Sequence, residues 1–312
     1  MTETSAPPKI VGIELGGTKS IVVLARGPTI LARQTFPTTT PNETIGAIRA
    51  VINAWLETYR VSAVGIASFG PIRIDEEASD YGTMLATPKV GWSGAMVAQR
   101  LMHGLDLPWA IDTDVNAAAL AELQWGAGQG LASLCYLTIG TGLGGGLIVN
   151  GRPIHGALHP EIGHLKLRRQ TGDSFDGICP FHGDCAEGLL SGPAIEARFG
   201  RPGQHVNSND PRWQFVAADL AELIATITLL ASPQRILIGG GVGLGQPALV
   251  DAAKGNILPI LNGYLPHITQ ELIATYIMAP ALGADAGPLG AVALGETAVG
   301  CGHRREQQRP SK

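Results

Sequence analysis

The residues with the clearest chemical potential in this chain lie in two loops rich in glycine and threonine, each placed after a hydrophobic strand. The first loop, Gly16–Lys19, follows the mainly apolar run 10–15, and the second, Gly140–Gly146, follows the mainly apolar run 134–139. A turn without Cβ atoms lets backbone N–H groups gather around an anion. Two such turns predict a pair of loops that close on a polyphosphate from opposite sides, as in a nucleotide-using enzyme built from two related halves.

Other phosphate-binding motifs fit these loops poorly. The segment Gly140–Gly145 satisfies G-x-G-x-x-G, but a Rossmann site needs a helix after the glycines to hold the pyrophosphate. Here the chain runs into an apolar strand and then into Asn150–Gly151, which is a hairpin signal. Gly16–Lys19 lacks the four-residue spacing of a Walker motif. The remaining alternative is that the glycines only form tight hairpins, and the third glycine run at Gly239–Gly241 argues against it.

A carboxylate that could accept a proton lies in the segment Ile111–Asn116, which is predicted to end a strand and open a helix. Phosphoryl transfer to an alcohol needs such a group, because the hydroxyl proton must leave as the new bond forms. The positive end of the helix dipole favours the ionised form. Asp112 and Asp114 would share one face if the strand continued, so chemistry alone does not choose between them. Asp114 would also suit the N-cap position of the helix.

Four side chains that bind metals occur within a short stretch: His164, Cys179, His182 and Cys185. Their spacing, H-x14-C-x2-H-x2-C, and their donor atoms suit a tetrahedral Zn²⁺ ion. Because four protein ligands leave no position for water or substrate, the site is expected to be structural and to order the segment between 164 and 190. The alternative is two isolated thiols and two surface imidazoles, which the compactness of the Cys179–Cys185 segment argues against.

The elements that must position these residues occur in two similar sets. The first half is predicted to contain strands near 9–14, 20–25, 29–36, 61–67 and 108–112, and helices near 43–59, 93–103 and 116–125. The second half is predicted to contain strands near 132–139, 145–149, 234–238 and 273–278, and helices near 212–231, 247–262 and after 287. The helix at 93–103 would be capped by Ser93 and end before Gly104. This order differs from the strict alternation of strands and helices in a Rossmann sheet. It predicts an α/β fold with a ribonuclease-H-like duplication, in which two domains have a cleft between them.

The expected domain limits follow from this duplication. A small N-terminal α/β domain would cover 9–115, and a larger C-terminal domain would cover 116–300 and carry the insert 152–200 with the metal cluster. The closing helix near 287–300 would pack back on the first domain. Residues 1–8 and 303–312 are expected to be flexible tails.

Length and composition limit the class of protein. A chain of 312 residues with 45% hydrophobic residues can form two domains with solid cores. Its net charge of −4 offers no basic field for nucleic acid or an acidic membrane. It contains no uninterrupted apolar run of about 18 residues, and residues 1–8 do not resemble an export signal. The four cysteines do not resemble a disulfide framework, so a cytoplasmic protein is expected.

Four ordered motifs resemble those of the ROK family of sugar kinases and repressors. The motifs are Glu14–Lys19, Thr138–Gly146, Pro160–His164 and Cys185–Glu187. Their order and spacing match the family from about residue 10 to 300. The resemblance implies an actin-like kinase fold, ATP with Mg²⁺ as phosphoryl donor and a hexose as acceptor. His182, in place of a more usual Cys, and the segment Thr87–Trp92 resemble the bacterial fructokinase branch.

Individual roles are also implied by the resemblance. The family pattern Asp-x-Asn selects Asp114 as the general base. The residues that match sugar-side positions are Ser68, Gly70, Pro71, Thr113, Glu161, His164 and Glu187. Thr113 stands where many relatives have an Asn that contacts the sugar, and His164 matches a residue that can bind metal and touch the sugar. If the family resemblance is set aside, Glu187 is explained as an acidic residue at a helix N-terminus and Glu161 as a solvated turn residue. His155 and His159 are then plain loop histidines.

The nucleotide would be held by both glycine loops and by two later glycine segments. The residues assigned to the phosphates and the adenosine side are Gly16, Gly17, Thr18, Lys19, Thr138, Gly140, Thr141, Gly142, Gly239, Gly240, Gly241 and Gly283. Lys19 is the nearest candidate to neutralise charge, although a solvated lysine is equally consistent. Glu14 stands where much of the wider superfamily has Asp, and its longer side chain could still reach a metal-bound water.

The sequence therefore predicts an ATP-dependent hexose kinase, and most specifically a fructokinase that makes fructose 6-phosphate. The alternatives are a ROK glucokinase, mannokinase or N-acetylmannosamine kinase, or a non-catalytic sugar sensor of the same fold. A homodimer is expected because the family is commonly dimeric. The repressors of the family carry a helix-turn-helix before the first strand, and residues 1–8 leave no room for one, so no nucleic-acid partner and no membrane partner are expected.

Overall fold

The protein, described here by a computed structural model of residues 7–307, divides into two compact units. Unit 1 runs to Gly126, includes His155–His159 and resumes at Ala284, whereas unit 2 comprises Ala127–Ile154 and Pro160–Gly283. The boundary expected near residue 115 falls inside unit 1, because the helix that begins there packs on the last helix of the chain. Of the two expected tails, residues 1–6 and 308–312 lie outside the described residues.

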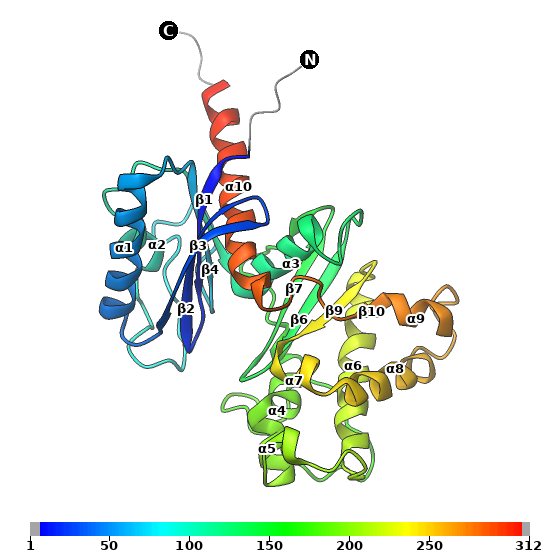
Figure 1. Cartoon of the computed structure of the whole chain (residues 1–312). Helices are drawn as coiled ribbons and strands as arrows, with labels where there is room; N and C mark the ends of the chain where they lie inside the picture. Colours follow the sequence, from blue (N-terminus) through cyan, green and yellow to red (C-terminus); the bar gives the residue numbers. More distant parts are fainter. Residues whose placement is uncertain (1–6, 308–312) are drawn as a thin grey trace. The chain divides into compact units, whose positions relative to one another are not determined.

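Unit 1 is built on a five-stranded mixed sheet in the order β3-β2-β1-β4-β5 (Figure 1). Its strands are β1 (Lys9–Leu15), β2 (Lys19–Arg26), β3 (Thr29–Pro37), β4 (Ala63–Ser68) and β5 (Trp109–Thr113). The first three strands form an antiparallel meander, whereas β1, β4 and β5 run parallel. The register pairs Leu15 with Ser68 and Ser68 with Thr113. The carboxyl ends of three strands therefore meet at one edge of the sheet.

Unit 2 repeats this topology strand for strand. Its sheet has the order β10-β9-β6-β7-β8. The strands are β6 (Leu134–Ile139), β7 (Leu143–Val149), β8 (Arg152–Pro153), β9 (Ile236–Gly239) and β10 (Ile277–Met278). Strands β6, β7 and β8 are antiparallel, and β6, β9 and β10 are parallel. The predicted duplicated α/β fold with two domains is confirmed, and β6 and its following loop are equivalent to β1 and its following loop.

One face of the unit 1 sheet is covered by helix α1 (Pro41–Thr58). The helix begins where the Thr40 hydroxyl accepts the N–H of Glu43, with a proline in the first turn. Ile45, Ile48 and Ile52 recur at helical spacing and are buried in the core against β1 and β2. This packing fixes the strands from which the functional loops emerge.

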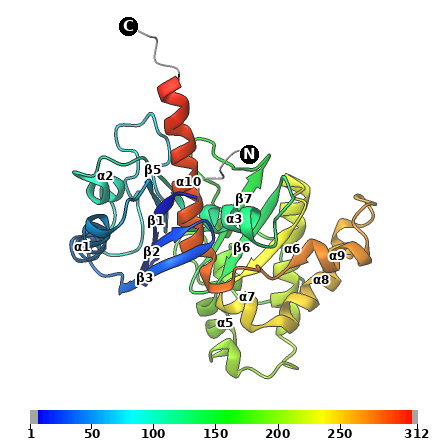
Figure 2. The same cartoon turned by 45° about the horizontal axis from the view of Figure 1, so that its top comes forward.

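The other face is covered by α10 (Ala286–Gln307), which also contacts α3 (Asp114–Trp125) (Figure 2). Glycines make this close approach possible. A Cβ atom on Gly65 of β4 would lie 1.8 Å from the carbonyl oxygen of Ala291, and one on Gly290 would lie 2.3 Å from the backbone of Ala117. Helix α10 is therefore part of the support for β4 and for the helix that carries Asp114.

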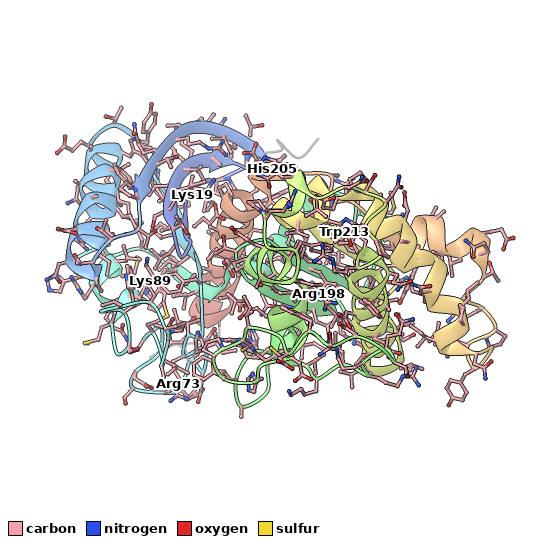
Figure 3. All side chains as sticks on the ribbon, turned by 90° about the horizontal axis from the view of Figure 1, so that it is seen from below. Lys19, Arg73, Lys89, Arg198, His205 and Trp213 are labelled. Carbon is pink, nitrogen blue, oxygen red and sulfur yellow. The ribbon has the colours of Figure 1, made fainter. Side chains whose placement is uncertain are left out.

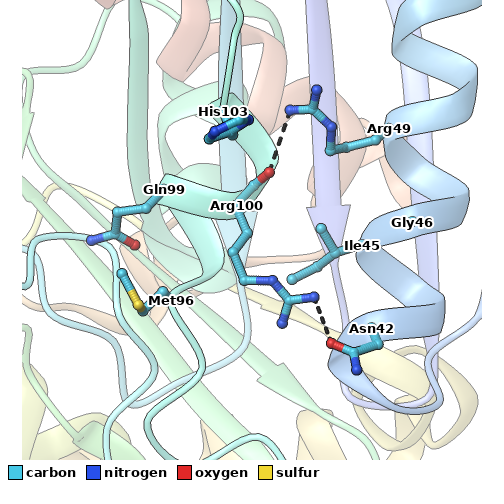
Figure 4. Close-up of a pocket in the computed structure, with 8 residues that line it drawn as sticks. All are labelled: Asn42, Ile45, Gly46, Arg49, Met96, Gln99, Arg100 and His103. Atoms are coloured by element: carbon cyan, nitrogen blue, oxygen red, sulfur yellow. Dashed lines mark hydrogen bonds between the residues drawn. The ribbon is translucent and has the colours of Figure 1, made fainter.

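Helix α2 (Val97–Met102) is shorter than the predicted helix at 93–103. Ser93 does not cap it, because the Ser93 hydroxyl bonds the backbone N–H and C=O of Thr87 instead. Arg49 of α1 donates to the carbonyl of Leu101 at 2.8 Å. It also donates to the carbonyl of Arg100 at 3.3 Å (Figure 4). The hollow of about 410 Å³ between α1 and α2 is thus a helix junction in which an arginine satisfies terminal carbonyls.

The helices of unit 2 surround a separate core. They are α4 (Ala186–Leu190), α5 (Gly192–Phe199), α6 (Trp213–Ala231), α7 (Gly240–Gly245), α8 (Pro247–Leu261) and α9 (Gln270–Tyr276). Among residues 7–307, α6 is the one helix that is long and apolar enough to cross a membrane. More than half of this apolar stretch is buried, and Leu220, Leu223 and Ile224 lie in the core. Its composition is therefore explained by its position inside unit 2.

Two further predictions differ from the structure. The strand expected at 273–278 is helical up to Tyr276, because Thr269 caps α9 by accepting the N–H of Leu272, and only Ile277–Met278 is extended. Helix α10 continues to Gln307, so residues 303–307, which were expected to be a tail, are helical.

A buried ion network ties the insert to α6. The side chain of Arg198 is 3% exposed, lies inside unit 2 (Figure 3), and reaches Asp173 and Asp219 at 3.0 Å each. Arg169 bonds Asp173 as well and lies 3.7 Å from Asp184. The network therefore ties the stretch that contains the predicted metal ligands to α5 and α6.

Candidate active site and metal cluster

The loop between β1 and β2 is a tight turn with an exposed tip. The N–H of Gly16 donates to the carbonyl of Lys19 at 3.1 Å, and a Cβ atom on Gly16 would lie 2.7 Å from that oxygen. Gly17, Thr18 and Lys19 are exposed. Thr38, which the sequence did not single out, holds the loop from behind: its hydroxyl donates to the Gly16 carbonyl at 2.8 Å, and its N–H donates to the Thr18 carbonyl at 2.9 Å. The exposed tip can therefore meet a ligand while the base of the loop stays fixed.

Asp114 is the first residue of α3, and Thr113 is the N-cap. The interpretation of Asp114 as the N-cap is therefore wrong, because the Thr113 hydroxyl takes that role and accepts the N–H of Asn116 at 3.2 Å. Asp114 accepts the N–H of Val115 at 2.9 Å. Burial raises the pKa of Asp114 to about 6, and its backbone hydrogen bonds act against that rise. At neutral pH this side chain is mainly ionised, as a general base must be.

Asp112 has a different environment from Asp114. The strand ends between them, so the two carboxylates do not share a strand face. Asp112 is 2% exposed, and one of its oxygens accepts the N–H of Thr113 at 2.7 Å and the side-chain amide of Asn116 at 2.9 Å. Because the hydrogen bonds of Asp112 are made within the protein, the geometry favours Asp114 as the carboxylate available to a substrate.

Glu14 lies near Asp114 at the edge of the unit 1 sheet. Burial raises the pKa of Glu14 to about 7; the charge of Asp114 raises it as well, while Lys19 and Arg33 lower it. One carboxylate oxygen of Glu14 is buried without a hydrogen-bond partner within the described residues. A Cβ atom on Gly287 would lie 2.2 Å from the other oxygen, so a glycine at the start of α10 is needed to accommodate this side chain. An unsatisfied acidic group beside a second one is a place where a cation would be stabilised.

The expected sugar-side turn, Ser68–Pro71, follows β4 at the same edge. The hydroxyl of Ser68 is buried and donates to the Phe69 carbonyl at 2.8 Å, whereas Gly70 and Pro71 are partly exposed. Trp92 supports the turn with an edge-to-face contact to Phe69, the ring centroids being 5.2 Å apart. The accessible part of this turn therefore includes Gly70 and Pro71 but not the Ser68 hydroxyl. Like Ser68, the hydroxyl of Thr113 is engaged within the protein.

The second loop lies in unit 2, between β6 and β7, and borders a hollow of about 420 Å³. Gly140 and Thr141 line it together with Gly241 of α7. The carbonyl of Gly140 accepts the N–H of Gly192 at 2.7 Å, which ties the loop to the first turn of α5. Sequence reasoning missed the residues that α5 and the following segment contribute to this hollow. They are Gly192, Pro193, Ile195, Glu196, Pro202, Gly203 and Gln204.

The later glycines that the sequence assigned to ATP are not equivalent in the structure. Gly241 lines the hollow, as do Val242 and Gln246. A Cβ atom on Gly239 would lie 2.7 Å from the Tyr136 hydroxyl, and one on Gly240 would lie 2.4 Å from the Ile139 carbonyl. Packing against β6 is therefore sufficient to require these two glycines. Thr138, within β6, and Gly283, at the end of unit 2, do not line this hollow.

The four predicted metal-binding side chains come together in unit 2. Their ligand atoms all lie within 4.8 Å of one another. The Nδ1 atom of His164 is 3.8 Å from the sulfur of Cys179 and 3.6 Å from that of Cys185, and Nδ1 of His182 is 3.7 Å from Cys179. Zn–S bonds of about 2.3 Å and Zn–N bonds of about 2.0–2.1 Å in a tetrahedron place a sulfur and a nitrogen roughly 3.6 Å apart. The donor set and its separations therefore fit one zinc ion.

The backbone around the cluster is shaped for this arrangement. Cys179 and Gly183 exchange two backbone hydrogen bonds of 2.8 and 3.0 Å, which close the turn that contains His182. Gly183 has a φ of +66°, a conformation that favours glycine. Cys185 is the N-cap residue of α4. The cluster is thus continuous with the helix that carries Glu187.

Glu187 contacts the glycine loop of its own unit. Its Oε2 atom accepts the N–H of Leu143 at 3.1 Å, and a Cβ atom on Gly142 would lie 2.9 Å from the same oxygen. Glycine at 142 therefore makes room for this carboxylate. Glu161 is exposed at the start of the single turn Ile162–His164. Glu187, which was expected to contact the sugar, thus supports the glycine loop between β6 and β7.

Comparison with known proteins agrees with this arrangement. A family model described as "ROK family" matches residues 10–298. The chain belongs to the ROK family. A fructokinase of Zymomonas mobilis subsp. mobilis is 40% identical over 296 residues, which cover 92% of this chain and 96% of that protein. A fructokinase of Lactococcus lactis subsp. cremoris is 41% identical over 255 residues, 81% of this chain and 85% of its own.

Solved structures support the same fold. The crystal structure of a ROK family glucokinase from Streptomyces griseus, in complex with glucose and AMPPNP, matches with a TM-score of 0.69 at 26% identity. The match covers 93% of this chain and 99% of that one. The present ROK protein carries its two glycine loops after equivalent strands, β1 and β6, of the duplicated sheet. The duplication of the fold therefore explains why the chain contains two such loops.

Proposed function

We propose that this ROK protein is an ATP-dependent fructokinase, which transfers the γ-phosphoryl group of ATP to the terminal hydroxyl of D-fructose and makes fructose 6-phosphate. The observation that carries the proposal is the 40–41% identity to two fructokinases over most of their length. The glucokinase of known structure is less similar, at 26% identity. The use of ATP is supported by the AMPPNP bound to that relative and by the glycine-lined hollow of unit 2.

In the proposed reaction Asp114 is the general base. The terminal oxygen of fructose forms a bond to the γ-phosphorus, its proton passes to the Asp114 carboxylate, and the bond between the γ-phosphorus and the β-γ bridging oxygen breaks to release ADP. A pKa of about 6 leaves Asp114 mainly ionised at neutral pH, and its place in the first turn of α3 puts it at the positive end of the helix dipole. The backbone of Gly70 and Pro71 would help to orient the sugar.

Mg²⁺ is the metal that this chemistry requires, and Glu14 is the residue in unit 1 that fits it. The buried oxygen of Glu14 lacks a partner among the described residues, and the nearby Asp114 adds a second negative charge. We propose that Glu14 holds the ion directly or through a water molecule, with Lys19 supplying further positive charge. When bound, Mg²⁺ neutralises charge on the β- and γ-phosphates.

Each unit, taken by itself, contains a glycine loop that we propose as a phosphate-binding element. In unit 2, Thr141 and Gly241, the second residue of α7, border one hollow, and backbone N–H groups of such turns suit phosphate oxygens. Pro193, Ile195 and Val242 supply apolar surface in the same hollow, which suits the adenosine part. In unit 1 the exposed turn at Gly17 and Thr18 would bind phosphate oxygens in the same way.

We propose in addition that His164, Cys179, His182 and Cys185 bind one structural zinc ion. The support is the tetrahedral fit of the donor atoms, with nitrogen–sulfur separations of 3.6–3.8 Å. The ion would fix the turn that leads into α4 and thereby Glu187, which holds the loop at Gly142 and Leu143. Its role is to order these residues, because four protein ligands leave no open coordination position.

The function is tested by coupled detection of ADP with a panel of sugars at fixed Mg·ATP. Fructose should give the highest kcat/KM, and the product should be fructose 6-phosphate by mass and chromatography. A higher kcat/KM with glucose, mannose or N-acetylmannosamine would assign a different ROK kinase activity. A protein that binds a sugar but releases no ADP with any of them would be a sensor. The Asp114→Asn variant, purified in parallel, excludes a contaminating kinase.

The assembly and location are proposed on the family resemblance. We expect a homodimer in the cytoplasm that binds no nucleic acid. Light scattering coupled to size-exclusion chromatography measures the mass directly, and a monomer across micromolar concentrations would contradict the first expectation.

A further inference from the structure

A five-residue segment, His155–His159, belongs to unit 1 although the chain on both sides of it belongs to unit 2. We call it the strap. From the sequence, both histidines were expected to be plain loop residues. In the structure both make hydrogen bonds to segments of unit 1 that carry the proposed chemistry, and Leu158 packs against the unit 1 core.

The first contact of the strap is with Asp112. The Nε2 atom of His155 donates to the Oδ2 atom of Asp112 at 2.8 Å, and the Asp112 side chain is 3% exposed. The other oxygen of Asp112 accepts the backbone N–H of Thr113 and the amide of Asn116. Thr113 in turn caps α3 by accepting the N–H of Asn116. The hydrogen bonds from His155 therefore lead through Asp112 to both residues that define the first turn of α3, where Asp114 lies.

The second contact of the strap is with the turn at Gly70–Pro71. The Nε2 atom of His159 accepts the N–H of Ile72 at 3.2 Å, and the His159 ring lies 3.4 Å from the position of a Cβ atom on Gly70. His159 is 6% exposed. The ring accepts this bond only when Nε2 carries no proton, so the imidazole in this contact is neutral. The strap thus packs directly behind the turn that is proposed to face the sugar.

We propose that the strap is a positioning element of the kinase site, in which His155 acts through Asp112 to hold the first turn of α3 and the carboxylate of Asp114. This inference rests on the proposed fructokinase function. His155 is a positioning residue, because its bond is to Asp112 and the reacting group is Asp114. The physical reason is that the buried carboxylate of Asp112 keeps one orientation when each of its oxygens accepts a hydrogen bond.

The charges around the pair are consistent with this role. The hydrogen bond to Asp112 raises the pKa of His155, burial lowers it, and the charges of Asp112 and Glu76 raise it further. The side chain of His155 is 39% exposed, so it can take up a proton from solvent. Without a partner at this position, Asp112 would be a buried carboxylate with one oxygen unsatisfied.

The test compares His155→Ala, His155→Gln and the matched control His103→Ala, an exposed histidine elsewhere in unit 1. His155→Ala should lower kcat for fructose about 10-fold to 100-fold, since a misplaced reacting group costs up to about 10²-fold, and should leave KM for ATP within about two-fold. Glutamine keeps a donor for Asp112, so His155→Gln should recover most of kcat. The control should keep the kcat of the unchanged protein. A purely structural histidine would lower the melting temperature without this selective loss of kcat.

Hydrogen exchange of the backbone amides at 112–118 provides a readout that does not depend on the substrate. His155→Ala should speed exchange there, whereas His155→Gln should restore slow exchange. The proposal is overturned if exchange at 112–118 is unchanged in His155→Ala, or if kcat stays within about two-fold of the unchanged protein. If the wild-type protein phosphorylates no sugar, the proposed function is refuted. The exchange measurement would still decide whether His155 holds the first turn of α3.

Discussion

Replacing Asp114 by Asn tests the central chemical assignment, because it removes the base while keeping the size of the side chain. A general base of this kind contributes about 10²–10⁴-fold to turnover, which corresponds to about 3–5 kcal/mol in the activation barrier. The fold should survive, since Thr113 caps α3 and the lost charge at the helix N-terminus is worth only about 0.3–1 kcal/mol. We therefore expect kcat for fructose to fall by about 10²–10⁴-fold with an unchanged circular dichroism spectrum.

The pH dependence of the unchanged protein gives a second measure of the same group. A pKa of about 6 means that about nine-tenths of Asp114 is ionised at pH 7 and about one-tenth at pH 5. Because the base must be ionised to accept a proton, kcat/KM should decrease as the pH falls through about 6. Burial is the cause of the elevated pKa, so the acidic limb should lie well above the ordinary range of an aspartate.

The assay is initial-rate ADP release from pH 5 to 8 with saturating Mg·ATP, and the matched control is Asp106→Asn. Asp106 is an exposed aspartate in the same unit, so its replacement removes the same charge away from the proposed base. The reasoning is refuted if folded Asp114→Asn protein retains kcat within about 10-fold, or if it loses no more activity than Asp106→Asn. An acidic limb that persists unchanged in the residual activity of Asp114→Asn would assign that titration to another group.

Three other predictions concern the metal sites and the stability of unit 2. Glu14→Gln should raise the Mg²⁺ concentration needed for half-maximal rate, because it removes the proposed anionic ligand; an unchanged Mg²⁺ activation curve would refute that role. Zinc analysis of metal-replete wild-type protein should give about one equivalent of zinc per chain. Cys179→Ser should lower this zinc content and speed hydrogen exchange across 164–190. Less than about half an equivalent in the wild-type protein would remove the zinc assignment. Arg198→Met should lower the free energy of unfolding by about 3–5 kcal/mol, because it removes the buried partner that lies 3.0 Å from Asp219. Arg168→Met should cost at most about 1 kcal/mol, because Arg168 is exposed in its ion pair with Glu222; urea denaturation compares the two variants, and equal effects would contradict the argument.

Local signals in the sequence were sufficient for the repeated elements and for the chemical groups. Hydrophobic periodicity and turn residues predicted most strands and long helices, because β1, β2, β4 and α1 are each specified by neighbouring residues. The glycine loops and the cysteine–histidine spacing depend on residues close together in the chain, so phosphate-binding and zinc-binding roles could be predicted for them from the sequence. The prediction failed at 273–278, where a capping threonine and helix formation outweighed the apolar pattern of a strand.

Only the tertiary structure decided which groups support one another across long separations in the chain. The bond between His155 and Asp112 spans 43 residues, and that between Glu187 and Leu143 spans 44. Gly287 makes room for Glu14 although one opens the last helix and the other ends the first strand. No local pattern encodes such pairs, because they depend on how separate elements pack. The sequence by itself determined which residues can bind phosphate, accept a proton or ligate a metal, whereas packing determined which of them are buried, held in place or shifted in pKa.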